Sequence, residues 1–527
     1  MKRIIPVLLA ALLLAGCANR DNSPEPNTDP TLPVENTWRV GGSLRLSMNV
    51  TRTLNPLLNR DVTVDRVLSL VFEPLARRDK TGKIVPHIAK SWDYDATGTV
   101  LTLRLDTSKT WHDGTAITAA DVVYSLDTLA AGPADSVYRP CLDKMAGYAR
   151  VDDSTVTITF KERTGGNLHA LVFPVISAAY YGGGNAVGSA KDLAPMGNGP
   201  FAVASFRQGK ALILEGRQNS FTARPHIDAV QVILVKDTAA AQCAFEQGIT
   251  DVFLTDQVWE QAGVQAVPVA TGQYEALGFS FRSATLLDSR IRQAVAYAIP
   301  REEIAAGAYL GELELCEGPL PLSSWLAQNQ TRVYVYDAEK ARELLAEAGW
   351  TDVNGDGYRE KTINAFFDRL SLTLLVNEEN TQRLRAAVSI RAALEVVGIQ
   401  VEIVSVPYDT YVQRLQKGQF DLFLGGFSLS EAPDYRALFR SDGKWNYMGY
   451  QSPLTDTLLD RAYEAVGSEA QLTAYGELQN QLVQELPVLS LGYLNEALLV
   501  SDHVGGTVAP LAGDIFSGIE NWYVVGE

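Results

Sequence analysis

The sequence predicts a mixed α/β protein with more than one domain. The chain has 527 residues, which is long enough for two or three domains with substantial cores. In the first half, short segments of alternating apolar and polar residues predict many strands. In the second half strand and helix patterns alternate, an order typical of a parallel sheet with right-handed helical crossovers.

Several segments of the first half alternate as half-buried strands do. Between residues 153 and 162, for example, Val156, Ile158 and Phe160 alternate with threonines. By the same criterion, strands are predicted over residues 41–50, 98–106, 153–162, 210–218 and 228–236. A helix is predicted over residues 64–79.

The second half begins with two helices that have clear capping residues. Asp288 opens the first, and Asp337 opens the second, which ends at Gly349. The parallel unit follows, with strand, helix, strand, helix and strand predicted over residues 370–376, 380–398, 399–406, 408–418 and 419–426. Ligands of such sheets lie beyond the carboxyl ends of the strands, and here that end is residues 424–435.

Charge and composition narrow the function classes. The formal net charge is −17 at pH 7, and a surface of this sign repels nucleic acid and anionic lipid. No nucleic-acid partner is therefore expected. The hydrophobic content of 46% and charged content of 20% are typical of an ordinary globular protein.

The N-terminus predicts export and lipid attachment. A basic start precedes an apolar run that is too short to span a bilayer. The stretch Leu14–Cys17, Leu-Ala-Gly-Cys, resembles the lipobox of bacterial lipoproteins, so residues 1–16 are predicted as a signal peptide and Cys17 as the lipidated residue. Plain secretion is the alternative. Residues 17–37 are polar, acidic and rich in proline, which predicts a flexible tether.

The remaining cysteines and histidines predict no metal centre. Cys141, Cys243 and Cys316 match no metal-binding spacing, and they leave open one disulfide or three free thiols. The five histidines are scattered and form no closely spaced pair. Residues 352–357 begin like a calcium loop, but the twelfth position, which needs a bidentate glutamate, holds Ile363. A polar turn is the favoured interpretation, and no metal or cofactor is expected.

Trp111, His112 and Asp113 are consecutive and raise the question of a catalytic pair. Neighbours in extended chain point to opposite faces, so His112 and Asp113 are not placed to share a proton. The Asp-Gly sequence that follows the tryptophan predicts a turn, and Thr118 with Asp121 predicts a helix-opening capping box. The stretch is therefore interpreted as a strand-turn-helix corner. No nucleophile motif is present, and no enzymatic activity is expected.

Several ordered stretches resemble one known family, the extracytoplasmic solute-binding proteins of ABC importers that bind oligopeptides, dipeptides and nickel complexes (solute-binding protein family 5). The resemblance extends from about residue 41 to about residue 523. It is carried by residues 72–127, 196–203, 288–304, 336–350 and 415–427. The lipoprotein-like start agrees with it independently.

The resemblance implies a two-lobed, periplasmic-binding-protein-like clamshell of type II. Lobe I is then residues 38–55, 195–272 and 487–527, with an extra subdomain over 56–194, and lobe II is residues 273–486. The ligand lies between the lobes and is buried by hinge closure. Main-chain hydrogen bonds and water-filled pockets suit an extended peptide whose side chains vary.

The resemblance also implies ligand-binding residues at the end of the last strand of the parallel unit. Peptide-binding relatives place an aspartate for the ligand ammonium three residues after a Gly-Trp pair. Here the pair is Gly426 and Phe427, followed by Ser428, and the aspartate position holds Ser430 with Glu431 next to it. Either Glu431 binds the ammonium, or the ligand has no free amino terminus.

The other implied ligand-binding residues are Tyr138, Tyr493, Thr255 and Asp256. Phe427 is expected to stack on the ligand backbone, with core packing as the alternative.

Together these observations predict the membrane-anchored binding component of an ABC importer, which delivers a peptide or peptide-like solute to the permease transmembrane subunits. The chain is expected to be a monomer on the outer face of the cytoplasmic membrane, held there by lipid on Cys17. A nickel complex, an oligosaccharide or another small solute is the alternative ligand. An extracellular hydrolase and a sensory receptor are the alternatives from other classes.

Overall fold

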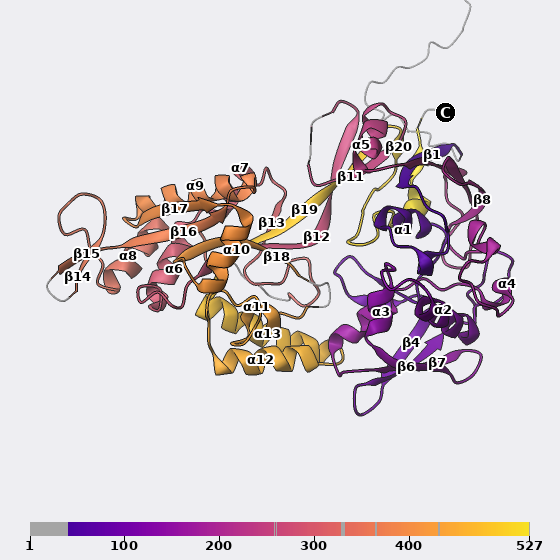
Figure 1. Cartoon of the computed structure of the whole chain (residues 1–527), viewed down its shortest axis with the longest axis horizontal. Helices are drawn as coiled ribbons and strands as arrows, with labels where there is room; N and C mark the ends of the chain where they lie inside the picture. The colour runs from indigo at the N-terminus through magenta and orange to yellow at the C-terminus, as the bar shows by residue number, and fades with distance from the viewer. Residues whose placement is uncertain are drawn as a thin grey trace, which may run out of the picture. The chain divides into compact units, whose positions relative to one another are not determined.

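The computed structural model describes residues 41–257, 259, 261–327, 333–363, 366–429 and 433–525. They belong to one compact unit, residues 39–527. Cys17 and the predicted signal peptide and tether lie outside the described residues. The mixed α/β class is confirmed, since helices and strands alternate along the chain (Figure 1).

Two four-stranded sheets belong to the first half of the chain. The first contains, in spatial order, β1 (Ser43–Asn49), β10 (Ala229–Val235), β9 (Ala211–Gly216) and β8 (Phe201–Arg207), with β1 parallel to β10. The second is antiparallel and contains β4 (Ala89–Tyr94), β5 (Val100–Leu105), β7 (Thr155–Phe160) and β6 (Met145–Arg150). The second sheet lies in the predicted extra subdomain, where alternate residues such as Leu101, Val156 and Ile158 are fully buried.

A seven-stranded sheet extends from the first half into the second. Its order is β11 (Val252–Thr255), β19 (Val488–Ser501), β12 (Val264–Phe279), β18 (Leu422–Ser428), β16 (Ser371–Asn377) and β17 (Gln400–Val406), with β13 (Leu313–Leu315) also paired to β19. The predicted parallel unit is confirmed, because β16 runs parallel to both β17 and β18. Its crossover helices are α9 (Thr381–Val396) and α10 (Tyr408–Lys417).

The remaining elements cover these sheets and form the loops. The longer helices are α1 (Val62–Leu68), α2 (Ala119–Ala131), α3 (Arg139–Asp143), α5 (Thr238–Glu246), α6 (Ser289–Ala298), α7 (Arg301–Gly307), α8 (Ala338–Glu347), α12 (Pro453–Glu464) and α13 (Ser468–Glu485). The short helices are η1 (Pro56–Leu58), η2 (Gly165–Leu171), α4 (Ala178–Tyr181), η3 (Ala190–Leu193), α11 (Arg436–Phe439) and η4 (Ile519–Asn521). The short strand pairs are β2 (Ala76–Arg78) with β3 (Ile84–Pro86), β14 (Glu360–Ile363) with β15 (Phe366–Arg369), and β20 (Val504–Gly505) with β21 (Tyr523–Val524).

The predicted helix over residues 64–79 is only half correct. Helix α1 ends at Leu68, and residues 76–78 form strand β2. Pro74 explains the difference, because it has no N–H to donate and disfavours helical geometry in the residue before it.

The corner at Trp111 has the structural role that its sequence predicts. Trp111 is buried, and Nε2 of His112 lies 2.9 Å from the carbonyl oxygen of Gly199. The Asp113 carboxylate accepts hydrogen bonds within its own turn, from Thr115. The capping box that opens α2 is confirmed.

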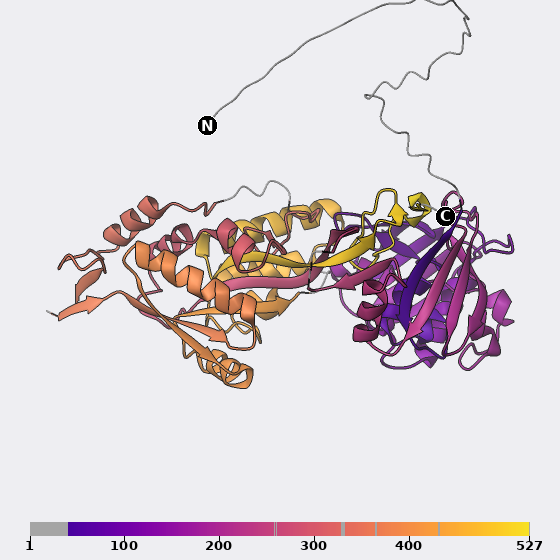
Figure 2. The ribbon, with the colours of Figure 1, turned by 90° about the horizontal axis from the view of Figure 1, so that it is seen from above.

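Strands β12 and β19 are the longest of the described strands and run side by side, as Figures 1 and 2 show. They pair from Val264 to Ala270 and again from Tyr274 to Gly278, with irregular register between the two stretches. On one side of the break β19 also pairs with β11, and on the other side β12 pairs with β18. The two strands therefore connect the β11 end of the sheet to the parallel unit through an irregular stretch.

A buried ion pair lies against β18 at the parallel end of this sheet. Glu275 of β12 accepts two hydrogen bonds from Arg383 of α9, at 2.8 and 2.6 Å, and a third from the Tyr309 hydroxyl. Burial lowers the pKa of Arg383, but its hydrogen bond to Glu275 and the charge of Glu275 outweigh burial and raise it. A Cβ atom on Gly426 would fall on both charged groups. Only glycine leaves room for the pair there.

We predict that Gly426→Ala lowers the free energy of unfolding by about 1–3 kcal/mol, because the added methyl group overpacks a buried ion pair. Gly147→Ala is the matched control, since a Cβ atom on this strand glycine meets open space, and its effect should stay within about 0.5 kcal/mol. Urea denaturation measures the free energy of unfolding of both variants. Equal stability of the two variants would show that the ion pair does not determine the residue at position 426.

Candidate functional site

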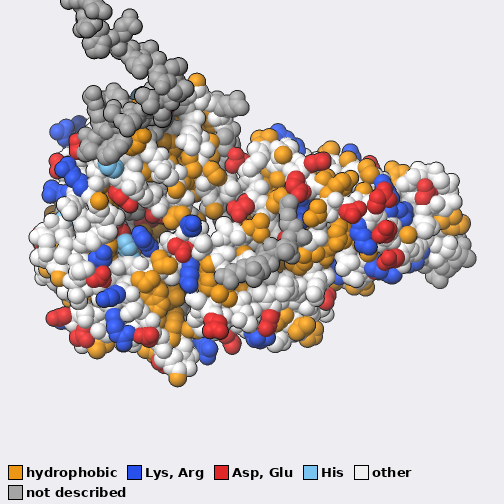
Figure 3. All heavy atoms as spheres, turned by 180° about the vertical axis from the view of Figure 1, so that it is seen from behind, with side chains coloured by type: hydrophobic (Ala, Val, Ile, Leu, Met, Phe, Trp, Pro, Cys, Tyr) orange, Lys and Arg blue, Asp and Glu red, His pale blue; other side chains and the backbone are white. Residues whose placement is uncertain are grey.

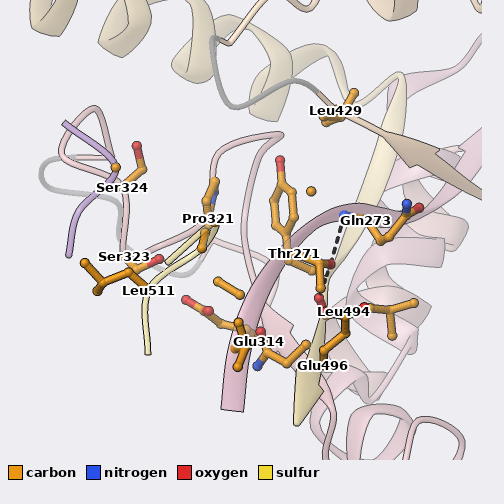
Figure 4. Close-up of a pocket in the computed structure, with 18 of the residues that line it drawn as sticks. Thr271, Gln273, Glu314, Pro321, Ser323, Ser324, Leu429, Leu494, Glu496 and Leu511 are labelled. Atoms are coloured by element: carbon orange, nitrogen blue, oxygen red, sulfur yellow. Dashed lines mark hydrogen bonds between the residues drawn. The ribbon is translucent and has the colours of Figure 1, made fainter. Parts of the chain in front are cut away.

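A cavity of about 920 Å³ lies over the irregular part of β12 and β19. Its floor is formed by residues 268–273 of β12 and 493–496 of β19, with Glu275 beside them. The hydroxyl of Thr271 donates to the carbonyl of Leu494, a bond drawn in Figure 4 between the two strands. The cavity is therefore located where the two long strands change partners.

One wall comes from the predicted lobe II, beyond the carboxyl ends of β16 and β18. Asn380, Gln382 and Arg383 open helix α9 after β16, and Leu429 follows β18. Tyr435 also belongs to this wall. The position of the wall agrees with the rule that ligands of parallel sheets bind beyond the carboxyl ends of the strands.

A loop after β13 forms another part of the wall and is fixed by a second buried ion pair. Arg301 and Glu317 lie 2.5 Å apart, with side chains at most 3% exposed. Arg301 also donates to the carbonyls of Cys316 and Ser490. Because these bonds tie the start of the loop to β19, its residues 320–326 are held at the cavity; Figure 4 shows Pro321, Ser323 and Ser324 of this loop.

The opposite wall comes from the predicted lobe I and its extra subdomain. It includes Arg66 of α1, residues 78–82 around the β2–β3 turn, Gly166 and His169 of η2, and residues 510–513. The loop after β13, which belongs to the predicted lobe II, contacts this wall directly. The backbone N–H of Trp325 donates to the Thr81 carbonyl at 3.1 Å, and Nζ of Lys83 lies 4.9 Å from the Trp325 ring centre.

A second contact joins the extra subdomain to helix α12 of lobe II. The Tyr463 hydroxyl donates to Glu162 at 2.9 Å, and Nε of Arg163 donates to the Glu464 carbonyl at 3.1 Å. These side chains are exposed. Because exposed polar contacts contribute little free energy each, these two bonds add little to the attachment of one lobe to the other.

The cavity has acidic and basic walls. Glu312, Glu314 and Glu496 lie on or beside β13 and β19, and Figure 4 shows Glu314 and Glu496 at the floor. Burial raises the pKa of Glu312, and it lowers the pKa of Arg66 against the opposing charge of Glu496. On the outer face seen in Figure 3, acidic and basic side chains are interspersed.

Two of the predicted ligand-binding residues, Tyr493 and Asp256, line the cavity. The Tyr493 hydroxyl donates to the Pro319 carbonyl at 2.6 Å, whereas Asp256 is exposed. Thr255, at the end of β11, bonds to the backbone of Gln257 and is not among the described lining residues.

The remaining predicted residues are placed away from the described lining or outside the described chain. Phe427 is buried against Trp445, Ser428 is exposed at the end of β18, and Gly426 accommodates the ion pair. The Tyr138 hydroxyl donates to Asp65 at 3.1 Å. Ser430 and Glu431 lie outside the described residues. The ligand-binding roles of all these residues stay predictions.

Sequence reasoning missed Arg78, His169, Trp325 and the acidic residues of β13. The sequence offered a weak signal for the first only, since Arg78 lies in the stretch 72–127 that carries the family resemblance. His169 and Trp325 stand in irregular segments, where no periodicity indicates which way a side chain points.

Within the described ranges there is no cluster of three or more histidine, cysteine or carboxylate side chains suited to a metal ion. Cys141 and Cys316 are buried free thiols, and Cys243 is an exposed one. None of the described helices is long and apolar enough to cross a bilayer.

Comparison with known proteins agrees with this arrangement. The chain is 23% identical over 536 residues to the oligopeptide-binding protein AppA of Bacillus subtilis, a match that covers 98% of this chain and 97% of AppA. An ABC transporter substrate-binding protein from Sinorhizobium meliloti has the same fold, with a TM-score of 0.75 and 23% identity over 92% of this chain and 100% of that one. NikZ of Campylobacter jejuni, solved with Ni(L-His), has a TM-score of 0.57 and 22% identity over 91% of this chain and 99% of NikZ.

These likenesses confirm the two-lobed α/β fold. Members of the family are solute-binding components of transporters. Residues 83–448 match the family described as bacterial extracellular solute-binding proteins, family 5, middle. This match covers more than half of the sequence, and the chain therefore belongs to the family 5 extracellular solute-binding proteins.

Proposed function

We propose that this protein captures a peptide or peptide-like solute between its two lobes and delivers it, unaltered, to an ABC permease. The observation that carries the proposal is the cavity of about 920 Å³ at the point where β12 and β19 pass from one lobe to the other. Its volume is at the upper end of the range of about 300–1,000 Å³ for ligand sites. A solute there contacts both lobes, so its binding energy favours closure.

Peptide is the preferred solute class for two reasons. The cavity offers carboxylates, guanidinium groups and neutral polar groups on different walls, which suits a ligand with both charges and main-chain amides. AppA, which matches almost the whole chain, is named as an oligopeptide-binding protein. We place the lobe boundary in β12 at residues 272–273, within the irregular stretch. We place the return crossing in β19 near residues 493–495, opposite that stretch, instead of at residues 486–487, where the family resemblance put it.

A nickel complex is the second candidate. NikZ shares the fold and is solved with Ni(L-His), and position 430, where peptide-binding relatives place an aspartate, holds serine. In this case the metal would be part of the solute, bound through its organic ligand.

We further propose that Cys17 carries lipid and that residues 17–37 tether the binding domain to the outer face of the cytoplasmic membrane. The Leu-Ala-Gly-Cys sequence and the proline-rich acidic segment support this. One acyl chain gives only marginal membrane binding, so stable anchoring requires more than one.

We predict that short peptides raise the melting temperature and change the fluorescence of Trp325. A solute at 100 times its Kd stabilises the folded state by about 2.7 kcal/mol, and Trp325 lies in the cavity wall beside Lys83. Trp325→Phe should remove most of the fluorescence change and keep the rise in melting temperature. Trp92→Phe, a change in β4 outside the described lining, is the control. If a broad peptide library changes neither signal, the peptide assignment is wrong.

We predict that Cys17→Ser abolishes incorporation of labelled fatty acid and moves the protein from the membrane fraction to the soluble fraction, because Cys17 is the cysteine that follows the Leu-Ala-Gly stretch. Asn19→Ser, two positions away in the tether, should remain labelled and membrane-bound. Metabolic labelling and cell fractionation measure both properties. Continued labelling of the Cys17→Ser protein would contradict the lipoprotein assignment.

A further inference from the structure

A short turn of the extra subdomain, residues 162–166, meets lobe II at the edge of the cavity. Glu162 and Arg163 make the two exposed bonds to helix α12, which contribute little free energy each. Gly166 lines the cavity. Gly165 lies between these two groups and is buried. The turn therefore closes the gap between the lobes on this side of the cavity.

Gly165 lies directly against lobe II. A Cβ atom at this position would overlap the carbonyl oxygen of Ala465, which caps α12, and Nε2 of Gln471 on α13. Gln471 has a flexible side chain that can rotate away, whereas the Ala465 carbonyl is part of the backbone. Gly165 is not one of the glycines with positive φ. Space, and not backbone conformation, therefore requires glycine here.

The turn itself has little freedom to move aside. The Thr164 hydroxyl accepts a hydrogen bond from the Gly166 N–H at 3.2 Å, and Nδ2 of Asn167 donates to the Glu162 carbonyl at 2.8 Å. The side chains of Thr164 and Asn167 are buried. Because these bonds fix the shape of the turn, a larger residue at position 165 is accommodated by movement of one lobe away from the other.

This overlap differs in kind from the one at Gly426. The neighbours of Gly426 belong to a single lobe, so a methyl group there disturbs one core. The neighbours of Gly165 belong to the other lobe, to which the first is joined through the irregular stretch of β12 and β19. A small rotation at that stretch would relieve the overlap at Gly165 and leave each core intact.

We propose that Gly165 is a positioning residue for solute binding, because its missing side chain allows the extra subdomain to close against lobe II. This rests on the proposed function, in which the solute contacts both lobes. A side chain at position 165 separates the lobes beside Gly166 and Gln471, which both line the cavity. The solute then loses contacts with one lobe, and its binding energy no longer favours the closed arrangement to the same extent.

The test compares the wild type with Gly165→Ala and with Gly147→Ala, a control in the same subdomain whose Cβ atom meets open space. The probe is the pentapeptide of a random library that raises the melting temperature of the wild type most. Gly165→Ala should bind it about 10- to 100-fold more weakly, mainly through faster dissociation. The melting temperature without peptide should change by less than about 2 °C. Gly147→Ala should match the wild type in both measurements.

Replacement of Gln471 shows whether the effect acts between the lobes. Gln471→Ala removes one of the two groups that the added methyl group overlaps and leaves the Ala465 carbonyl in place. Gly165→Ala should therefore cost several-fold less affinity in the Gln471→Ala protein than in the wild type. A distortion confined to the turn would cost the same affinity in both proteins and would contradict the proposal. Titration calorimetry and surface plasmon resonance measure the affinities and dissociation rates.

The other outcomes separate this role from the function on which it rests. Wild-type affinity in Gly165→Ala overturns the positioning role and leaves the proposed function standing. A fall of several degrees in the melting temperature of Gly165→Ala without peptide also overturns it, because the contact would then be permanent packing. If no pentapeptide binds to the folded wild-type protein, the proposed function is overturned and the positioning role with it.

Discussion

The pairing of β12 with β19 is the constraint on which the rest of the structure depends. The two strands are hydrogen-bonded in both lobes, yet their register breaks between Ala270 and Tyr274. A continuous ladder would stiffen the crossing between the lobes, whereas two unpaired strands would connect the lobes only as flexible chain. The break supplies a bend with few bonds to distort, and the cavity lies directly over it. A hinge at this break would be built from the same residues that form the cavity floor.

Buried ion pairs fix the cavity walls on the lobe II side. Glu275–Arg383 ties the floor strand β12 to helix α9, and Arg301–Glu317 ties the loop after β13 to β19. Such pairs gain little net stability because desolvation offsets their attraction. Their effect is geometric, since each holds a wall segment through several directed hydrogen bonds. Two of the contacts between the lobes, Tyr463 with Glu162 and Arg163 with the Glu464 carbonyl, are of the opposite kind, because they are exposed and contribute little free energy each.

The helices and strands with regular apolar patterns could be predicted from the sequence, but the surroundings of individual side chains could not. The parallel unit from β16 to β18 follows from periodicity and capping, because its apolar stripes belong to long, regular elements. The helix predicted over 64–79 failed where Pro74 outweighed the apolar pattern. Gly426 was predicted as part of the ligand site, but its environment is an ion pair between residues 108 positions apart in the chain.

The central claim is that two hinged lobes close over a solute and release it chemically unchanged. Spin labels at Lys210→Cys in lobe I and Gln416→Cys in lobe II, with the exposed thiol removed by Cys243→Ser, allow the distance between the lobes to be measured by pulsed electron paramagnetic resonance. With a bound peptide the distance distribution should narrow and shift, and the peptide recovered afterwards should have its original mass. An identical distribution with and without tightly bound peptide, or a cleaved peptide, would contradict the account.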